Sequence, residues 1–491
     1  YQWQHLQGFD PRHALDVGRP LNIFSGLLVF DNFSIFLKIF LLSFTALVIL
    51  LCHFTGIPDR EDSADFFCLL LGATLGMSIM ASANHLLMVF IGIEMASLPS
   101  YALAGFLKGR RQSSEASLKY VVYGGGAAGI MLYGISLLAG KFGTAYLPDL
   151  LHFMAMAPLD PMVLLGTLFI LIGIGFKLAA VPFHFWCPDV FEGASAEVAA
   201  FLSVASKGAA LALLGRITLG LGGLSAADAS ALAWKNVAPY LVPALAFFAA
   251  LTTTFGNLAA YRQTNLKRLL AYSTIAHAGF MMMGLATLTR EGAGAVLFYL
   301  IVYLFMNLGA FAIVAYLRNL TGSEDLASFR GLIHRSPVLV ITLGVFFLSL
   351  LGMPPLGGFT AKFQIFKELY SGANHYASLG SSMPGGSAVS VSLYALLVIG
   401  GLNTVVSLFY YVKVLKVMIL EKSIEEVEGR PVESIGVPFL ARSYVSLLAA
   451  VVIYLGLFWD PLAKASYNVG VSNFEPTPTH DAVLAAKGGR L

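Results

Sequence analysis

The sequence predicts an all-α polytopic membrane protein with about twelve transmembrane helices, a fold class that three observations support. The chain of 491 residues is 57% hydrophobic and only 12% charged, whereas soluble domains are about 45–50% apolar and about 25% charged. Apolar stretches of about 20 residues, each long enough to cross a hydrocarbon core of about 30 Å, recur along the whole chain. Lysine and arginine concentrate in alternate connections between these stretches.

The predicted spans follow one another with mostly short connections. We place them near residues 32–54, 64–83, 85–107, 116–140, 162–186, 194–216, 238–260, 267–288, 292–317, 336–369, 389–418 and 439–459. The tenth and eleventh exceed the length that a membrane requires, so we expect each to be tilted or broken. The polar, proline-containing tail after about residue 470 is expected at the surface or disordered.

The basic residues between the spans predict the orientation. With alternating spans, one side of the membrane receives Arg60, Lys108, Arg110, Arg111, Lys119, Arg262, Lys267, Arg268, Arg318, Arg330, Arg335, Lys413, Lys416, Lys422, Arg430 and Arg442. The other side receives only Lys141, Arg216, Lys235, Arg290 and Lys367. The positive-inside rule assigns the first group to the cytoplasm or its equivalent and both termini to the outer side.

Four spans hold an ionisable side chain well inside the membrane, namely Glu94, Lys177, Lys207 and Lys362. A charge at that depth is unfavourable unless it faces a wet or paired interior, so we interpret these residues as functional. Lys177 and Lys207 flank the short segment CPDVFEGAS. On two antiparallel helices they are expected at the same depth, about 15 Å from the connecting loop, with Glu94 as the counter-charge. This pattern predicts a path for protons or other cations.

Prolines near two of these lysines predict broken helices. Pro182 and Pro188 follow Lys177, and the segment Met353-Pro354-Pro355-Leu356-Gly357-Gly358 precedes Lys362. Proline removes an intrahelical hydrogen bond and kinks or breaks the helix. Breaks at membrane depth are tolerated where the backbone lines a cavity, and they mark ion sites in transporters.

An internal repeat predicts the division of the chain. Glu94 precedes Lys177 by 83 residues and His277 precedes Lys362 by 85, with each lysine two spans after its partner. This spacing predicts two units of five spans, each with a broken helix. Because each unit has an odd number of spans, the second is inverted in the membrane relative to the first. The predicted segments are 1–63 with the first span, 64–216 as the first repeat, 217–237 as a connection, 238–418 as the second repeat, and 419–491 with the last span and tail.

The cysteines favour no cofactor in this chain. Cys52, Cys68 and Cys187 are far apart and form no metal or cluster motif, which argues against zinc, an iron–sulfur centre or a disulfide framework. The chain also carries no nucleotide loop and no nucleic-acid motif.

Several strings resemble the antiporter-like subunits of respiratory complex I, and in particular the subunit N type of bacterial NADH:quinone oxidoreductase. They are FIGIEMASLPSYALAGF, FKLAAVPFHFWCPDVFEGA, FLSVASKGAALALLGR, FGNLAAYRQTNLKRLLAYSTIAHAGF and GMPPLGGFTAKFQIF, within residues 64–418. By this resemblance Glu94 and Lys177 correspond to the carboxylate–lysine pair of a first half-channel. Lys207 corresponds to the central lysine and Lys362 to the lysine of the second half-channel.

The resemblance also implies the biological setting. It implies a proton-translocating subunit in the bacterial inner membrane, surrounded by lipids, neighbouring antiporter-like subunits and small helical subunits. Quinone, FMN, iron–sulfur clusters and NADH would be used in other subunits. Two departures stand out: the family has fourteen spans, so two would precede residue 20, and a Gly-Ala-Pro-x-Pro string is replaced by residues 192–201, EGASAEVAAF.

Other interpretations remain open from the residues. His184 and His277 are either relay groups or hydrogen-bonded structural residues, and Lys267 is either a relay group or an anchor at the membrane boundary. A sodium/proton antiporter subunit or a membrane-bound hydrogenase subunit of the same fold is the alternative function. A membrane scaffold without transport is a third, which predicts that changing the buried charges affects assembly alone.

Overall fold

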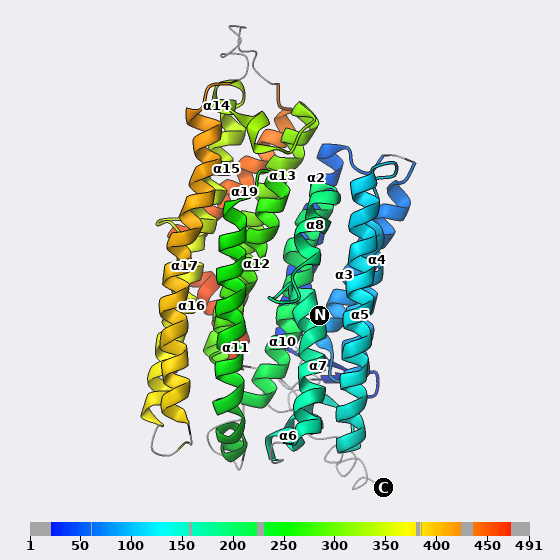
Figure 1. The fold of residues 1–491 in the computed structure, drawn as a ribbon, viewed down its shortest axis with the longest axis vertical. Helices are drawn as coiled ribbons and strands as arrows, with labels where there is room; N and C mark the ends of the chain where they lie inside the picture. The colour runs from blue at the N-terminus through cyan, green and yellow to red at the C-terminus, as the bar shows by residue number, and fades with distance from the viewer. Residues whose placement is uncertain are drawn as a thin grey trace, which may run out of the picture.

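A computed structural model describes residues 21–59, 61–156, 160–222, 230–379, 383, 385–423 and 436–472. Most of the described chain forms long helices that run along the long axis of the molecule (Figure 1). They are α2 (Asn32–Thr55), α3 (Ser63–Ser82), α4 (Leu86–Ala104), α5 (Arg111–Phe142), α6 (Leu147–Met156), α7 (Pro161–Leu178), α8 (Trp186–Gly193), α9 (Ala196–Phe201), α10 (Lys207–Gly222), α11 (Ser230–Tyr261), α12 (Leu266–Leu285), α13 (Arg290–Thr321), α14 (Leu332–Arg335), α15 (Pro337–Leu351), α16 (Gly357–Ser378), α17 (Gly386–Leu420), α19 (Phe439–Leu457) and α20 (Asp460–Ser472).

The predicted all-α membrane architecture is confirmed, and a helix lies at each of the twelve predicted spans. Within the described residues, ten helical segments are long and apolar enough to cross a membrane. The two predicted spans outside that set are α12, which begins with a polar turn containing Lys267 and Arg268, and the tenth span, which is divided into α15 and α16.

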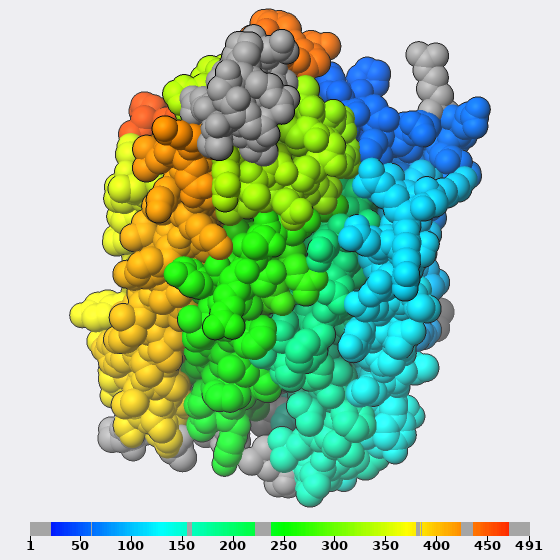
Figure 2. All heavy atoms as spheres, turned by 45° about the horizontal axis from the view of Figure 1, so that its top comes forward, coloured from blue at the N-terminus to red at the C-terminus, as the bar shows by residue number. Residues whose placement is uncertain are grey.

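The helices differ strongly in burial, and this places the centre of the molecule. In α13, 89% of the most apolar window is buried inside the protein, and in residues 196–220 the whole window is buried. The corresponding share is 33% for α5 and for α17, which lie at opposite edges of the bundle (Figure 1). The space-filling view shows the outer helices as neighbouring columns on the surface (Figure 2). Their exposed leucine, valine and phenylalanine side chains suit contact with lipid or with other membrane helices.

Three irregular segments lie next to the three buried lysines. The helix α7 ends one residue after Lys177, where Ala179 adopts a left-handed conformation with φ of 55°. A π-helix, η1 (Leu202–Ser206), directly precedes Lys207. Between α15 and α16, Gly352 has a φ of 91° and a turn containing Pro354 and Pro355 follows. Such segments present backbone groups and side chains to the interior of a helical bundle.

Several boundaries correct the sequence predictions. The fifth span, predicted for 162–186, ends at Leu178, and its continuation α8 contains most of the segment expected to be a loop. Lys177 therefore lies at a helix end and not ten helical residues from a loop. The tenth span is broken as expected, whereas α17 is an unbroken helix of 35 residues. The sequence analysis missed α6, α20 and a short hairpin of β1 (Leu21–Ile23) and β2 (Leu28–Phe30). The predictions for the chain before residue 21 and after 472 lie outside the described residues.

Candidate functional site

Lys177 is completely buried at the end of α7 and reaches α4. Its Nζ donates a hydrogen bond to Ser97 Oγ at 3.0 Å, and Ser97 Oγ in turn donates to the carbonyl oxygen of Ile93 at 2.6 Å. Ser97 lies three residues after Glu94 and so shares its face of the helix. Within the described residues, no ion pair under 4 Å joins Lys177 to Glu94, although the two are within electrostatic range. The predicted pairing is therefore not a direct contact, and the hydrogen-bond partner of Lys177 is Ser97, which lines the same cleft as Glu94.

Glu94 lines a narrow cleft between α4, α5 and α7. Ser97, Tyr101 and Gly124 line the same cleft. Gly124 is required here, because a Cβ at this position would lie 2.6 Å from Cζ of Tyr101. The half-buried Glu94 carboxylate is thus near the outer face of the chain, while Lys177 is in its interior.

Lys207 lies at the junction of η1 and α10 and is 1% exposed. Its Nζ has no hydrogen-bond partner among the described residues. His184 and Cys187, on the segment that follows the break in α7, lie within its electrostatic range. A buried ammonium group requires acceptors, and water is the usual one where side chains do not supply them.

His277 connects the surroundings of Lys207 with those of Lys362. Its Nδ1 lies 2.7 Å from Tyr299 Oη and its Nε2 lies 3.3 Å from Tyr411 Oη. The charges of both Lys207 and Lys362 act on it. His277 is therefore hydrogen-bonded to two tyrosines and within electrostatic range of both lysines, and its role as a relay group remains a prediction.

Lys362 lies in the second turn of α16 and is 3% exposed. Its Nζ donates to the carbonyl oxygen of Leu351 at 2.8 Å and lies 4.6 Å from the centre of the Phe280 ring. Leu351 is the last residue of α15, so the ammonium group sits where the helix end concentrates negative partial charge. The helix break therefore provides the acceptor that the buried lysine needs.

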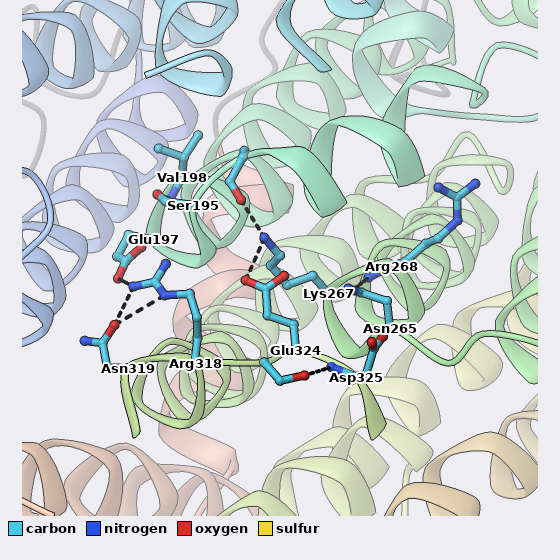
Figure 3. Close-up of polar contacts among 12 residues, drawn as sticks. Ser195, Glu197, Val198, Asn265, Lys267, Arg268, Arg318, Asn319, Glu324 and Asp325 are labelled. Carbon is cyan, nitrogen blue, oxygen red and sulfur yellow. Dashed lines mark hydrogen bonds and ion pairs between the residues drawn. The ribbon is translucent and has the colours of Figure 1, made fainter. Parts of the chain in front are cut away.

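The two remaining candidate residues are also buried. His184 is 2% exposed, and its ring lies 4.4 Å from the Phe255 ring, centre to centre. Lys267 is 2% exposed; its Nζ donates to the carbonyl oxygen of Ala194 at 2.7 Å and lies 2.9 Å from Glu324 Oε1 (Figure 3). Lys267 thus contacts the linker between α8 and α9, and the roles of both residues remain predictions.

Sequence reasoning missed two buried ion pairs. Arg216 binds Asp31 through two hydrogen bonds of 2.9 and 3.2 Å, across 185 residues of chain. Arg318 contacts Glu197 at 3.3 Å, and the carboxylate of Glu197 is completely buried. In each pair the sequence shows an acidic residue near the start of a predicted span and an arginine near the end of a distant one. Which acidic residue contacts which arginine depends on the tertiary fold.

A charged cavity opens at the end of the bundle next to Lys267. It has a volume of about 210 Å³ and is lined by Gln112, Glu115, Ala116, Lys119, Asp189, Glu192, Gly193 and Arg268. Asp189 binds both Lys119 and Arg268, each at 2.7 Å. Partial burial favours the protonated form of Asp189, but these hydrogen bonds outweigh it and hold the pKa of Asp189 below its ordinary value.

The lowered pKa of Asp189 predicts a pH-dependent contribution to stability. A carboxyl whose folded pKa is depressed stabilises the fold above its unfolded pKa of about 3.9, and that contribution is lost as the pH falls through the folded value. We expect Asp189→Asn to lower the thermal unfolding temperature at pH 7 and to have a diminishing effect below about pH 4. Thermal unfolding of both proteins between pH 3 and pH 7 measures this, and an effect independent of pH would contradict it.

Together, the fold and these contacts define a class: a helical membrane protein with a row of buried ionisable groups beside helix breaks. A family model described as NADH:quinone oxidoreductase/Mrp antiporter, TM matches residues 83–383. NADH-quinone oxidoreductase subunit N 2 of Sorangium cellulosum is 41% identical over 90% of this chain and 84% of its own length. A chain of respiratory complex I from Thermus thermophilus is 32% identical, with a TM-score of 0.68, over 92% of this chain and 89% of that one.

A second solved structure shares the fold alone. A chain of the Mrp complex from Dietzia is 21% identical, with a TM-score of 0.75, over 93% of this chain and 86% of that one. The family match covers more than half of the chain, and the similarity to subunit N extends over most of both proteins. The chain therefore belongs to the NADH:quinone oxidoreductase/Mrp antiporter family. Within this family it is similar to the subunit N proteins of NADH-quinone oxidoreductase.

Proposed function

We propose that this chain is the proton-translocating membrane subunit of an NADH:quinone oxidoreductase, embedded among the other membrane subunits of that complex. Glu94, Lys177, Lys207 and Lys362 form its proton path, with His277 between the last two. The observation that carries this proposal is the burial of three lysines beside three helix irregularities, because such charges are tolerated in a membrane only along a hydrated or paired interior.

The proposed mechanism is a shift of proton populations along the row. A change in the charge of Glu94 alters the protonation of Lys177, and a proton then moves to Lys207, to Lys362 and out of the membrane. The driving redox chemistry belongs to NADH, FMN, iron–sulfur clusters and quinone in other subunits, so this chain acts as part of a translocase of the EC 7.1.1 type. We assign it to the bacterial inner membrane with both termini on the outer side.

The organisation into two inverted five-span units, 64–216 and 238–418, remains part of the proposal. It is supported by the occurrence of a broken helix before or beside a buried lysine in each unit, at Lys177 and at Lys362. The second candidate function, a sodium/proton antiporter subunit, is favoured by the shared fold with the Mrp chain.

Lys177→Ala tests the function. In membranes from a strain carrying this substitution, we expect an assembled complex in which proton pumping and electron transfer from NADH to quinone fall together, by about tenfold. Membranes with unchanged pumping and unchanged electron transfer would limit the family relationship to the fold. Absence of quinone reductase activity in the purified complex, together with sodium-dependent proton exchange, would favour the antiporter.

A further inference from the structure

Two buried ion pairs lie side by side where α9 begins and α13 ends (Figure 3). Arg318, near the end of α13, contacts Glu197 in the first turn of α9. Lys267 contacts Glu324 and the carbonyl oxygen of Ala194. The close-up shows the Lys267 side chain at the linker between α8 and α9 and the Arg318 guanidinium beside Glu197.

The Glu197–Arg318 pair is incomplete. Its one contact, from Arg318 Nη2 to Glu197 Oε1, is 3.3 Å long, and Glu197 Oε2 and Arg318 Nη1 have no partner among the described residues. Arg318 has a stronger second partner, because Asn319 Oδ1 accepts from its Nη2 at 2.9 Å. A buried ion pair is stable only when its remaining donors and acceptors are satisfied. The free carboxylate oxygen is therefore suited to accept a proton, and Asn319 can hold the arginine when it does.

Glu197 lies at the head of the helical segment that carries Lys207. The two residues are ten positions apart, which corresponds to roughly 15 Å along a helix. The intervening π-helix η1 carries Ser203, whose hydroxyl accepts a hydrogen bond from Asn307 Nδ2 on α13. Asn307 Oδ1 is buried and has no partner among the described residues, like Lys207 Nζ. Buried polar atoms of this kind are ordinarily satisfied by ordered water.

A short apolar stretch separates Glu197 from this polar group. Ala200 lies between Glu197 and Ser203 along the chain, Phe311 and Val314 lie between Asn307 and Arg318 on α13, and all three are completely buried. From Glu197 to Ser203 the helix rises by roughly 9 Å, a length that about three hydrogen-bonded water molecules can bridge. We call this contact between α9 and α13, from Glu197 to Ser203, the seam. Apolar constrictions conduct when they contain water and block when they are dry, so proton transfer along the seam is expected to be intermittent.

We propose that Glu197 is a second proton-loading residue for Lys207, in addition to Lys177, an inference that rests on the proposed function. The carboxylate takes up one proton on Oε2 from the solvent side and becomes neutral, while Arg318 keeps its contact with Asn319. The proton then passes along transient water beside Ser203 and Asn307 to the neutral amine of Lys207. That step forms the ammonium group and returns Glu197 to its anionic form, so only a proton is transferred.

The test uses the complete complex reconstituted in liposomes, with NADH:quinone turnover and protons moved per electron as readouts. Glu197→Gln keeps the size and polarity of the side chain but cannot carry the proton. We expect it to lower both readouts by about tenfold, while Glu197→Asp, which keeps a carboxylate, restores most of the loss. Glu324→Gln is the matched control, because Glu324 belongs to the neighbouring ion pair and not to the seam, and it is expected to pump normally.

The variants separate proton loading from structural support. Glu197→Gln/Arg318→Gln removes both charges and so leaves no unpaired ion. If the single variant assembles poorly, an assembled double variant with the same loss of pumping supports proton loading. Normal pumping in assembled Glu197→Gln or in the assembled double variant, alongside impaired pumping in Lys177→Ala, overturns the role of Glu197. The proposed function then remains in place. Normal pumping in Lys177→Ala as well overturns both.

Discussion

Lys362→Gln is expected to lower proton pumping and coupled electron transfer by at least about tenfold while the complex still assembles. In the structure, Lys362 Nζ donates to the carbonyl oxygen of Leu351, and in the proposed proton path its amine takes up and releases a proton. Glutamine offers an amide N–H for the hydrogen bond but cannot take up and release a proton. Turnover and pumping in reconstituted complex measure the proton transfer separately.

Lys367→Gln provides a control on the same helix. Lys367 lies five residues after Lys362; its side chain is 57% exposed and pairs with Glu368, whose side chain is 9% exposed. Water screens the exposed Lys367 end of this pair, and a glutamine amide can still donate to Glu368, so this substitution is expected to leave pumping and stability nearly unchanged. Equal losses in the two variants would point to a general effect of lysine removal on α16, and normal pumping in Lys362→Gln would remove Lys362 from the proton path.

Asp31→Ala is expected to give the largest loss of stability among single substitutions outside the row of lysines. Asp31 is the N-cap of α2, where its carboxylate accepts from Ser34 N, and it also binds Arg216 through both oxygens. Removing it takes away the counter-charge of the buried arginine, whose Nε and Nη2 also donate to the carbonyl oxygen of Ala81. Breaking a buried pair in this way costs about 3–5 kcal/mol, which should appear as a lower unfolding temperature and less assembled complex.

The double variant Asp31→Ala/Arg216→Gln tests whether the loss of the counter-charge of Arg216 is the cause. With neither charge present, the electrostatic penalty of the broken pair disappears, and most of the lost stability should return. A double variant as unstable as Asp31→Ala would instead assign the loss to the N-cap of α2, whose removal costs about 1 kcal/mol in typical helices. Unfolding temperatures of the single and double variants distinguish these causes.

The burial of the three lysines was predictable from the sequence, but their contacts were not. Lys177, Lys207 and Lys362 stood out because a charge within an apolar stretch of about 20 residues is visible in any one span. The acceptor of Lys177 is Ser97, 80 residues away, and that of Lys362 is a carbonyl oxygen released by a helix break. A serine in an apolar helix and a free carbonyl group have no distinctive signal in the sequence, and neither could be assigned in advance.

The sequence by itself determined the spans, the charges within them and the proline-marked breaks, because these depend on the length, polarity and backbone chemistry of one segment at a time. Only the tertiary structure decided which residues face one another. Arg216 meets Asp31, and Arg318 meets Glu197 across 121 residues, because each helix has a particular rotation about its axis and a particular neighbour. Those choices result from side-chain packing between helices, which no single segment specifies.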